Sequence, residues 1–291
     1  MSTIVLTGAS RGIGLATALA LSRAGHVVHA TMRNPAASPE LAAAAAAEKL
    51  PITIHAMDVD SDASVAGTFG AILAQTPVDV LVNNAGVERT GSIEETPLEA
   101  FRVCMETNYF GALRCTQAVV KHMRERGKGC IVNVTSVAGR LANAPNTAYV
   151  ASKWAFEALS ECLAQEMKPF GVRVVVVEPG IIDTRMAHNI AQMQISKIYP
   201  QGRRMAALFE ASLSASAPPS LIASKIREVI ESGTWQLRHP AGPDAAPFLA
   251  WRASMTDEQW IDWNSLSDAD WLAAVKKDFG MDLRLGSEPK A

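Results

Sequence analysis

The pattern of hydrophobic and polar positions predicts strands and helices in regular alternation. Short apolar runs rich in β-branched residues occur at residues 3–7, 27–31, 52–56, 79–83, 130–134, 172–177 and 234–237. We interpret these runs as seven strands. Because the runs are apolar almost throughout, rather than at every second position, both faces of each strand should be buried, as in a parallel sheet covered by helices.

Helical patterns fill the intervals between these strands. They occupy residues 13–24, 38–49, 62–75, 97–126 and 148–168. A helix that connects two parallel strands forms the usual crossover of an α/β sheet. The predicted fold class is therefore α/β, a Rossmann-type, doubly wound, seven-stranded parallel sheet with helices on both faces.

Two segments depart from this rhythm. Residues 185–219 are rich in methionine, carry no strand pattern and form an insertion after the sixth strand. Residues 246–291 hold four of the six tryptophans, and the spacings of Thr256 with Gln259 and of Ser267 with Asp270 are typical of capped helices. We predict two short amphipathic helices there. With no linker in the chain, residues 1–245, including the insertion, should form one domain, with 246–291 as its helical extension.

Composition excludes several classes of protein. The chain has 291 residues, of which 48% are hydrophobic and 19% charged, so it can bury a core. Its 27 Lys and Arg balance 29 Asp and Glu without a basic run, which argues against a nucleic-acid partner. No apolar run is long enough for a membrane span, and no signal peptide precedes the first strand. We expect a cytoplasmic protein that does not enter a membrane.

The cysteines suggest neither a disulfide framework nor a metal site. They are scattered, without a C-x-x-C motif or a neighbouring histidine cluster, and we interpret all four as buried thiols. The four are Cys104, Cys115, Cys130 and Cys162. No metal is therefore expected.

A glycine-rich turn follows the first strand directly. It reads Thr7-Gly8-Ala9-Ser10-Arg11-Gly12-Ile13-Gly14 and runs into a helical pattern. Glycines at such a turn allow a close backbone approach, and exposed N–H groups at a helix N-terminus favour a pyrophosphate. The alternative is that the turn is merely tight.

The end of the second strand bears on which dinucleotide is bound. A carboxylate there would accept hydrogen bonds from the adenosine ribose, but the sequence has Met32 followed by Arg33. Arg33 and Arg11 could instead surround a 2′-phosphate, so NADP(H) is preferred over NAD(H). The alternative is that both arginines are ordinary surface charges.

Three residues suggest acid–base chemistry. Tyr149 and Lys153 lie four residues apart in a helical pattern and so share one face. An adjacent ammonium favours a phenolate and would lower the pKa of Tyr149 from its ordinary value of ~10. Ser136 follows the fifth strand, at the sheet edge where open α/β sheets bind ligands, and could hold a carbonyl oxygen.

With these motifs in order, the sequence resembles the classical short-chain dehydrogenases/reductases over residues 2–243. The shared motifs are the glycine turn, Asp58-Val59, Asn83-Asn84-Ala85-Gly86, Asn108, Ser136, Tyr149-x-x-x-Lys153 and Pro179-Gly180-x-x-x-Thr184. A looser similarity, in residues 30–35, 178–180 and 238–245, suggests the branch around hydroxysteroid and retinol dehydrogenases.

The resemblance implies roles for individual residues. Tyr149 would transfer the proton, Ser136 would orient the substrate oxygen, Lys153 would bind the nicotinamide ribose, and Asn108 would complete a proton relay. Hydride would pass between the cofactor and the carbonyl carbon. The remaining cofactor contacts would come from Asp58 and Val59 at the adenine, from Asn83, Ala85 and Gly86 on the adenosine side, and from Pro179, Gly180, Ile182 and Thr184 at the nicotinamide.

The favoured function is an oxidoreductase that uses NADP(H) on the carbonyl or secondary alcohol of a hydrophobic substrate. Met186, Met193 and Met205 are candidate pocket residues, because methionine adapts to varied apolar shapes. The alternatives are a catalytically silent dinucleotide-binding regulator, an NAD-dependent dehydrogenase with a small polar substrate, and a sugar-nucleotide epimerase or dehydratase. The resemblance also implies a homodimer or homotetramer, because the helices around 97–126 and 148–168 resemble those that pair across two-fold axes in this family. Cys162, Leu163 and Met167 give the second of these helices an apolar stripe, although packing within the monomer would explain that stripe almost as well.

Overall fold

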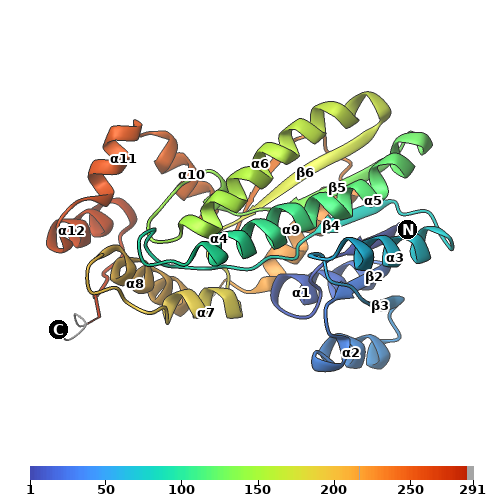
Figure 1. Cartoon of the computed structure of the whole chain (residues 1–291), viewed down its shortest axis with the longest axis horizontal. Helices are drawn as coiled ribbons and strands as arrows, with labels where there is room; N and C mark the ends of the chain where they lie inside the picture. The colour runs from blue at the N-terminus through green and yellow to red at the C-terminus, as the bar shows by residue number, and fades with distance from the viewer. Residues whose placement is uncertain (216, 287–291) are drawn as a thin grey trace.

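The computed structural model describes residues 1–215 and 217–286, which form a seven-stranded parallel sheet in the order β3-β2-β1-β4-β5-β6-β7 (Figure 1). This confirms the predicted fold class. The insertion's Ser216 and the last five residues of the predicted extension lie outside the described residues. The strands are β1 (Thr3–Leu6), β2 (Val27–Met32), β3 (Ile52–Ala56), β4 (Val80–Asn83), β5 (Gly129–Val134), β6 (Val172–Pro179) and β7 (Arg238–Ala241).

Helices cover both faces of the sheet. One face carries α1 (Gly12–Arg23), α2 (Glu40–Glu48) and α9 (Pro219–Glu231), which pack in one hydrophobic cluster. The other carries α3 (Asp62–Leu73), α5 (Gly111–Arg126) and α6 (Thr147–Met167). The predicted helix at 97–126 is a continuous run of α4 (Leu98–Met105), the π-helical turn η2 (Glu106–Phe110) and α5. Short 3₁₀ turns are η1 (Pro35–Ala37), η3 (Val137–Gly139) and η4 (Lys168–Phe170).

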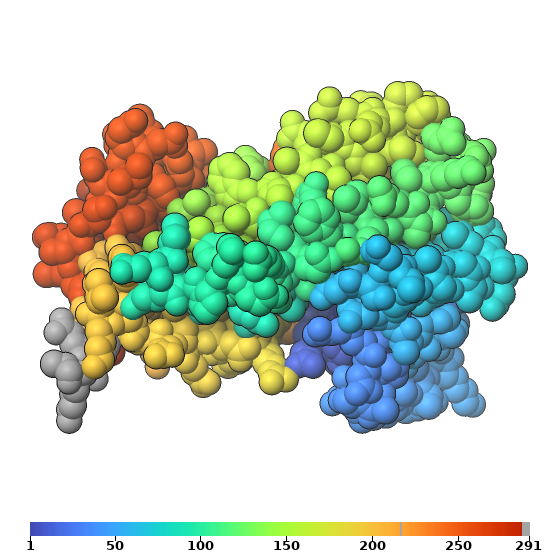
Figure 2. Space-filling model, viewed as in Figure 1, coloured from blue at the N-terminus to red at the C-terminus, as the bar shows by residue number. Residues whose placement is uncertain are grey.

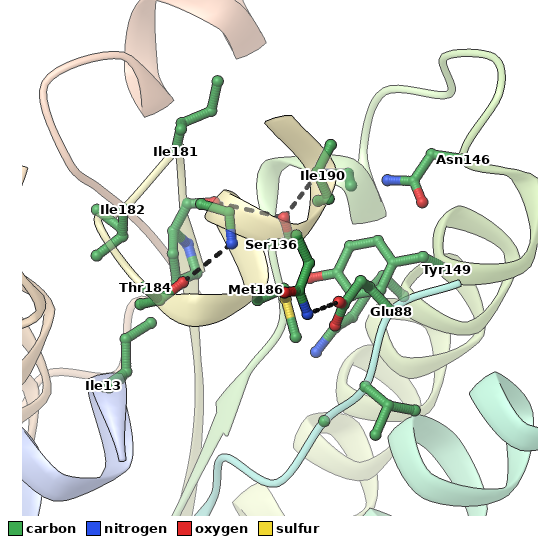
Figure 3. Close-up of a pocket in the computed structure, with 18 of the residues that line it drawn as sticks. Ile13, Glu88, Ser136, Asn146, Tyr149, Ile181, Ile182, Thr184, Met186 and Ile190 are labelled. Carbon is green, nitrogen blue, oxygen red and sulfur yellow. Dashed lines mark hydrogen bonds between the residues drawn. The ribbon is translucent and has the colours of Figure 1, made fainter. Parts of the chain in front are cut away.

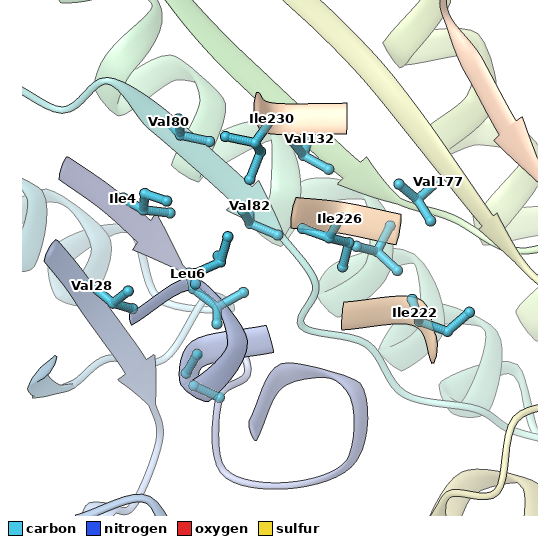
Figure 4. Packing of buried hydrophobic residues seen from close by; sticks show 14 of the residues in the cluster. Ile4, Leu6, Val28, Val80, Val82, Val132, Val177, Ile222, Ile226 and Ile230 are labelled. Carbon is cyan, nitrogen blue, oxygen red and sulfur yellow. The ribbon is translucent and has the colours of Figure 1, made fainter. Parts of the chain in front are cut away.

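Alternation along the strands builds the two cores. In β1, Ile4 and Leu6 face α1 and α9, whereas Val5 faces α3 and α5. Successive side chains of a strand point to opposite faces, so an apolar run is needed to fill both. Figure 4 shows β1, β2, β4, β5 and β6 contributing aliphatic side chains to the first core, where Ile222, Ile226 and Ile230 of α9 meet them.

The strand order positions the site. β1 lies between β2 and β4, so the chain winds outward in opposite directions from this point. The loops that leave the carboxyl ends of β1 and β4 therefore diverge and leave a crevice, which is where open α/β sheets bind ligands.

The seventh strand lies four residues later than the sequence pattern indicated. The predicted strand at 234–237 is wrong, and β7 is formed by Arg238–Ala241, paired with β6 from Val176 to Pro179. The strand contains Pro240, whose ring removes a backbone donor. A proline is tolerated here because β7 is the edge strand and pairs on one side alone.

Another correction concerns Cys162, which is exposed, whereas the other three cysteines are buried. On α6 the buried positions include Ser160, Leu163 and Met167, and the helical period places Cys162 on the solvent side. Leu163 and Met167 belong to the core beneath the sheet. Packing within the monomer therefore accounts for the stripe proposed as a contact between subunits.

The insertion and the extension are helical and lie together at one end of the molecule (Figure 2). The insertion contains α7 (Arg185–Ala191) and α8 (Gln201–Ser214), and α9 begins at its end. The extension contains α10 (Ala245–Ala253), α11 (Asp257–Asn264) and α12 (Asp268–Phe279), one helix more than predicted. Thr256 and Gln259 form the predicted capping box of α11, and Ser267 caps α12 by accepting the Asp270 N–H.

Candidate active site

The glycine turn is packed too closely for larger residues. Gly8 and Gly12 have φ values of +70° and +53°. A Cβ at Gly8 would lie 2.8 Å from the Ala85 Cα, and one at Gly14 would collide with the Gly8 carbonyl oxygen. The α1 helix starts at Gly12 with no side-chain cap, which leaves its first N–H groups free for an anion. The turn therefore fits the pyrophosphate of a dinucleotide.

Two neighbouring asparagines at the end of β4, Asn83 within the strand and Asn84 directly after it, have different surroundings. Asn84 donates its side-chain amide to the carbonyls of Thr7 (2.9 Å) and Gly8 (3.2 Å), so it holds the glycine turn. Asn83 is buried beneath the site, where it bonds Asn133 (2.9 Å) and Thr116 (3.1 Å). Asn83 was expected to contact the cofactor, but it does not line the cavity. Its neighbour Asn84 does.

One continuous cavity of about 760 Å³ extends from the glycine turn to the C-terminal helices. Its volume lies within the range of ~300–1,000 Å³ that is usual for ligand pockets. The expected cofactor residues that line it are Gly8, Ser10, Arg11, Gly12, Ile13, Gly14, Arg33, Asp58, Val59, Ala85, Gly86, Tyr149, Lys153, Pro179, Gly180, Ile182 and Thr184.

The loop after β6 is fixed by a residue just beyond the end of β7, the strand next to β6. Asp244 accepts the backbone N–H of Ile181 at 2.8 Å, and a Cβ at Gly180 would collide with the same carboxylate. Thr184 then caps α7 by accepting the N–H of Ala187 at 3.4 Å. The segment expected to face the nicotinamide is therefore held in one conformation.

Three of the four residues expected to perform catalysis, Ser136, Tyr149 and Lys153, line this cavity. Figure 3 shows Ser136 beside Tyr149. Ser136 follows β5 and caps η3 by accepting the Ala138 N–H at 3.1 Å. Tyr149 and Lys153 lie one turn apart on α6, and Lys153 donates to the Val134 carbonyl at 3.1 Å. The helix and the strand end thus bring a hydroxyl, a phenol and an ammonium to one place.

Burial dominates the protonation of the tyrosine and the lysine. It raises the pKa of Tyr149 to about 12, while hydrogen bonding from Ser136 acts in the opposite direction and the charge of Glu88 adds to the rise. Burial also lowers the pKa of Lys153 to about 8, partly offset by Glu157. The prediction that Lys153 lowers the pKa of Tyr149 is wrong for this structure, because burial of the phenol raises that pKa instead. At neutral pH, the hydroxyl of Tyr149 is therefore protonated.

Asn108 lies in the π-helical turn η2, a distortion that is frequent at functional sites. Its side chain is fully buried, accepts the Val87 N–H (2.8 Å) and donates to the Val87 carbonyl (2.9 Å) and the Ser152 hydroxyl (2.8 Å). Asn108 does not line the cavity, but it fixes the loop after β4 beside Lys153.

Glu88 is a site residue that the sequence analysis missed. It lines the cavity near Tyr149, and Asn189 of α7 donates a hydrogen bond to its carboxylate at 3.0 Å (Figure 3). No motif marks it, because a lone glutamate in a loop is usually a solvated charge. The contact joins the loop after β4 to the helical insertion that covers the site.

The three candidate methionines have different positions. Met186 packs against Ala138, Tyr149 and Val150, and Met205 is buried in the wall of the same cavity. Met193 is not among the lining residues, and its methyl lies near Gly202. The insertion thus supplies two of the three expected pocket residues.

The C-terminal extension supplies a wall that was not predicted. Trp251, Trp260, Trp263 and Trp271 all line the cavity. The sequence showed the tryptophans but gave no indication of their direction, because their distance along the chain from Tyr149 conceals their proximity in the fold.

In the part of the chain that the structure describes, no three histidine, cysteine or acidic side chains are grouped to hold a metal ion. Among the same residues, no helix has both the length and the apolar character needed to cross a lipid bilayer.

The fold and the glycine turn define a dinucleotide-dependent oxidoreductase. A family model described as short chain dehydrogenase matches residues 2–195, so the chain belongs to the short-chain dehydrogenase family, whose members act on CH–OH and C=O groups with NAD or NADP. An uncharacterised oxidoreductase of Bacillus subtilis, YusZ, is 33% identical over 90% of this chain and 95% of its own. Bovine retinol dehydrogenase 8 is 34% identical over 86% and 85%, respectively.

Solved structures agree with this assignment. A short-chain dehydrogenase from Streptomyces avermitilis is 33% identical and superimposes with a TM-score of 0.76, covering 91% of this chain and 97% of its own. The family resemblance, including relatives among the retinol dehydrogenases, is thereby confirmed.

Proposed function

We propose that the chain is an NADP(H)-dependent reductase and dehydrogenase acting on a hydrophobic carbonyl compound or the corresponding secondary alcohol. The observation that carries the proposal is the single cavity that joins the glycine turn to Ser136, Tyr149 and Lys153 and continues into apolar walls. When bound at the glycine turn, the dinucleotide supplies or accepts the hydride.

The chain's own residues handle the oxygen and its proton. Ser136 holds the substrate oxygen by hydrogen bonding, and Tyr149, neutral because its pKa is raised, donates the proton to that oxygen during reduction. Lys153 places a positive charge near the developing phenolate and binds the nicotinamide ribose. Asn108 keeps the adjoining loop in place through its bonds to Val87.

Arg11 and Arg33 support the choice of NADP(H). Both are exposed at the cavity wall, one in the glycine turn and one directly after β2. Within the described residues, neither guanidinium has a hydrogen-bonding or ion-pair partner. Two such groups provide donors and charge for a 2′-phosphate.

The lining of the cavity supports a hydrophobic substrate rather than a small anionic one. Met186, Met205 and the tryptophans of the extension line the substrate end, and Glu88 places negative charge beside Tyr149. A small anionic keto acid would meet repulsion from Glu88 and would leave the apolar walls in water.

The extension belongs to the catalytic domain in this proposal. Trp260 donates to the Ala142 carbonyl at 2.7 Å, and Ala245, Phe248 and Leu249 pack with Val137 and Leu141, just after Ser136. These contacts support one domain over 1–245 that includes the insertion, with 246–291 as its extension. We further propose a homodimer or homotetramer.

A substrate panel tests the proposal. Ketones, aldehydes and secondary alcohols are assayed by nicotinamide absorbance with NADPH, NADH and the oxidised forms. We expect turnover of bulky apolar carbonyls with NADPH. Absence of turnover with every carbonyl and alcohol would contradict the reaction class, and small charged keto acids as the best substrates would contradict the substrate class.

A further inference from the structure

Six aromatic rings of the C-terminal extension form one connected group, which we call the aromatic cluster. All six line the same cavity as Ser136 and Tyr149. The cluster consists of Phe248, Trp251, Trp260, Trp263, Trp271 and Phe279.

The cluster is arranged around Trp251. Its ring centroid lies 5.3 Å from that of Trp260, 4.9 Å from that of Trp263 and 4.7 Å from that of Phe279, with interplanar angles of 71–77°. Edge-to-face contacts of this kind are favourable and directional. Hydrogen bonds fix two of the rings, from Trp260 to the Ala142 carbonyl (2.7 Å) and from Trp263 to Asp278 (3.2 Å). The cluster is therefore preorganised.

The rings are accessible from the cavity. Trp271 is buried, whereas the other five remain partly exposed, and all six stand on the cavity wall. The cavity is continuous, so a molecule whose carbonyl lies at Tyr149 could extend to these rings.

The charged groups near the cluster are already paired. Arg204 of α8 is 5% exposed and donates to Asp268 (2.7 Å) and to the carbonyls of Leu266 (2.7 Å) and Asn264 (3.3 Å). Its guanidinium also lies 5.6 Å from the Trp271 ring centroid. Because its donors are occupied by the protein, Arg204 ties the insertion to α12 rather than offering a site for an anion.

We propose that the aromatic cluster is the distal part of the substrate site and binds the planar ring system of an elongated aromatic ketone or aldehyde. This inference rests on the proposed function and narrows its substrate class from hydrophobic to elongated and flat. Ring faces and edges held in fixed orientations favour a planar group over a saturated one of the same carbon skeleton, because a planar group can make offset or edge-to-face contacts. Neutral rings suit this end of the cavity, where the guanidinium of Arg204 is already paired with Asp268.

The test uses two ketones that differ in planarity, 2-acetylnaphthalene and its saturated counterpart 2-acetyldecalin, with butanone as a ketone too short to reach the cluster. Trp251→Leu and Trp263→Leu remove rings from the cluster. Trp235→Leu is the matched control, because Trp235 is half exposed and lies outside the cavity. Steady-state KM and kcat are measured with saturating NADPH.

We expect each cluster variant to raise KM for 2-acetylnaphthalene by about tenfold and KM for 2-acetyldecalin by less. Trp235→Leu should leave all values unchanged. Retained turnover of butanone shows that a variant is folded. Unchanged KM for 2-acetylnaphthalene in both cluster variants, or an equal rise for both bicyclic ketones, would overturn the proposal.

A binding measurement separates this inference from the proposed function. Quinoline, a planar bicycle without a carbonyl, is titrated into the protein by calorimetry. Binding that is lost in Trp251→Leu and kept in Trp235→Leu supports the subsite even if no carbonyl is turned over. Absent binding, or equal binding in all variants, would contradict the subsite even if the protein is an active reductase.

Discussion

The ammonium nitrogen of Lys153 lies 5.6 Å from the centroid of the Tyr149 ring, one helical turn away on α6. Both side chains are buried, and the same desolvation that keeps the tyrosine protonated weakens the proton affinity of the lysine. A protonated phenol therefore lies next to an ammonium group, and the ammonium loses its positive charge at moderately alkaline pH.

The pH dependence of reduction follows from this pair. The pKa of Lys153 is lowered to about 8, so its charge is complete below that pH and lost above it, whereas Tyr149, with a pKa of about 12, stays protonated. We expect kcat/KM for carbonyl reduction to be level from pH 6 to 7 and to fall with a midpoint near 8. A profile that stays level to pH 10 would contradict this assignment.

Lys153→Arg is the matched variant for that profile. A guanidinium keeps its charge throughout this range, so the remaining activity should not fall near pH 8. The measurement is the initial rate as a function of pH. The shape of this profile is compared, because the shape does not depend on how much activity the larger arginine side chain leaves. The same midpoint in both proteins would assign the titration to another group.

Cofactor preference should depend on Arg33. Hydrogen bonds to charged groups contribute ~1.5–3 kcal/mol, so Arg33→Ala should raise KM for NADPH by about tenfold or more and change KM for NADH little. Arg227→Ala, on the exposed side of α9, is the control. Wild-type protein that prefers NADH would show that Arg11 and Arg33 do not bind a phosphate.

The glycine turn offers a second test of cofactor binding. A Cβ at Gly14 would lie 2.6 Å from the Asn84 amide nitrogen, so Gly14→Ala should weaken NADPH binding and lower Tm. In Gly67→Ala, the new methyl would meet no atom within 4 Å on α3. That control should gain ~0.5–1 kcal/mol in the free energy of unfolding and keep its affinity for NADPH. Equal affinities in both variants, measured by fluorescence titration, would contradict the close packing of the turn.

Sheet and helix periodicity were sufficient to predict the architecture. Runs such as 172–177 carry a direct signal, because a strand buried on both faces must be apolar throughout. The edge strand β7 has no such constraint, and its sequence Arg238-His239-Pro240-Ala241 gives no strand pattern. The apolar pattern at 234–237 therefore predicts a strand four residues before the one that forms.

The site was predictable where backbone geometry restricts the residue type, and less so elsewhere. Gly8 and Gly14 are required by close approach, and Tyr149 and Lys153 are joined by helical spacing. Glu88 reaches the site through the tertiary fold alone, and no local pattern marks it. The same holds for the tryptophans of the extension.

Three exposed apolar side chains on neighbouring elements support the proposed assembly. Leu98 of α4, Phe110 of η2 and Trp154 of α6 are 63%, 42% and 48% exposed, on elements that pack against one another. We expect these side chains to be buried against a second copy, and Trp154→Glu should convert a dimer into a monomer in light scattering. Trp235→Glu is the control. A wild-type monomer at micromolar concentration, or an unchanged assembly in Trp154→Glu, would contradict this interface.

We propose that Tyr149 transfers a proton in a dinucleotide-dependent reduction, and the variant Tyr149→Phe is the sharpest test of this role. The substitution removes a single hydroxyl from a buried ring, so the fold and the glycine turn should persist. General acid catalysis contributes ~10²–10⁴-fold, and we expect kcat for carbonyl reduction to fall by at least ~10²-fold. The dissociation constant for NADPH, measured by fluorescence titration on the same preparation, should change less than about threefold. Turnover near the wild-type rate with NADPH bound normally would contradict the account.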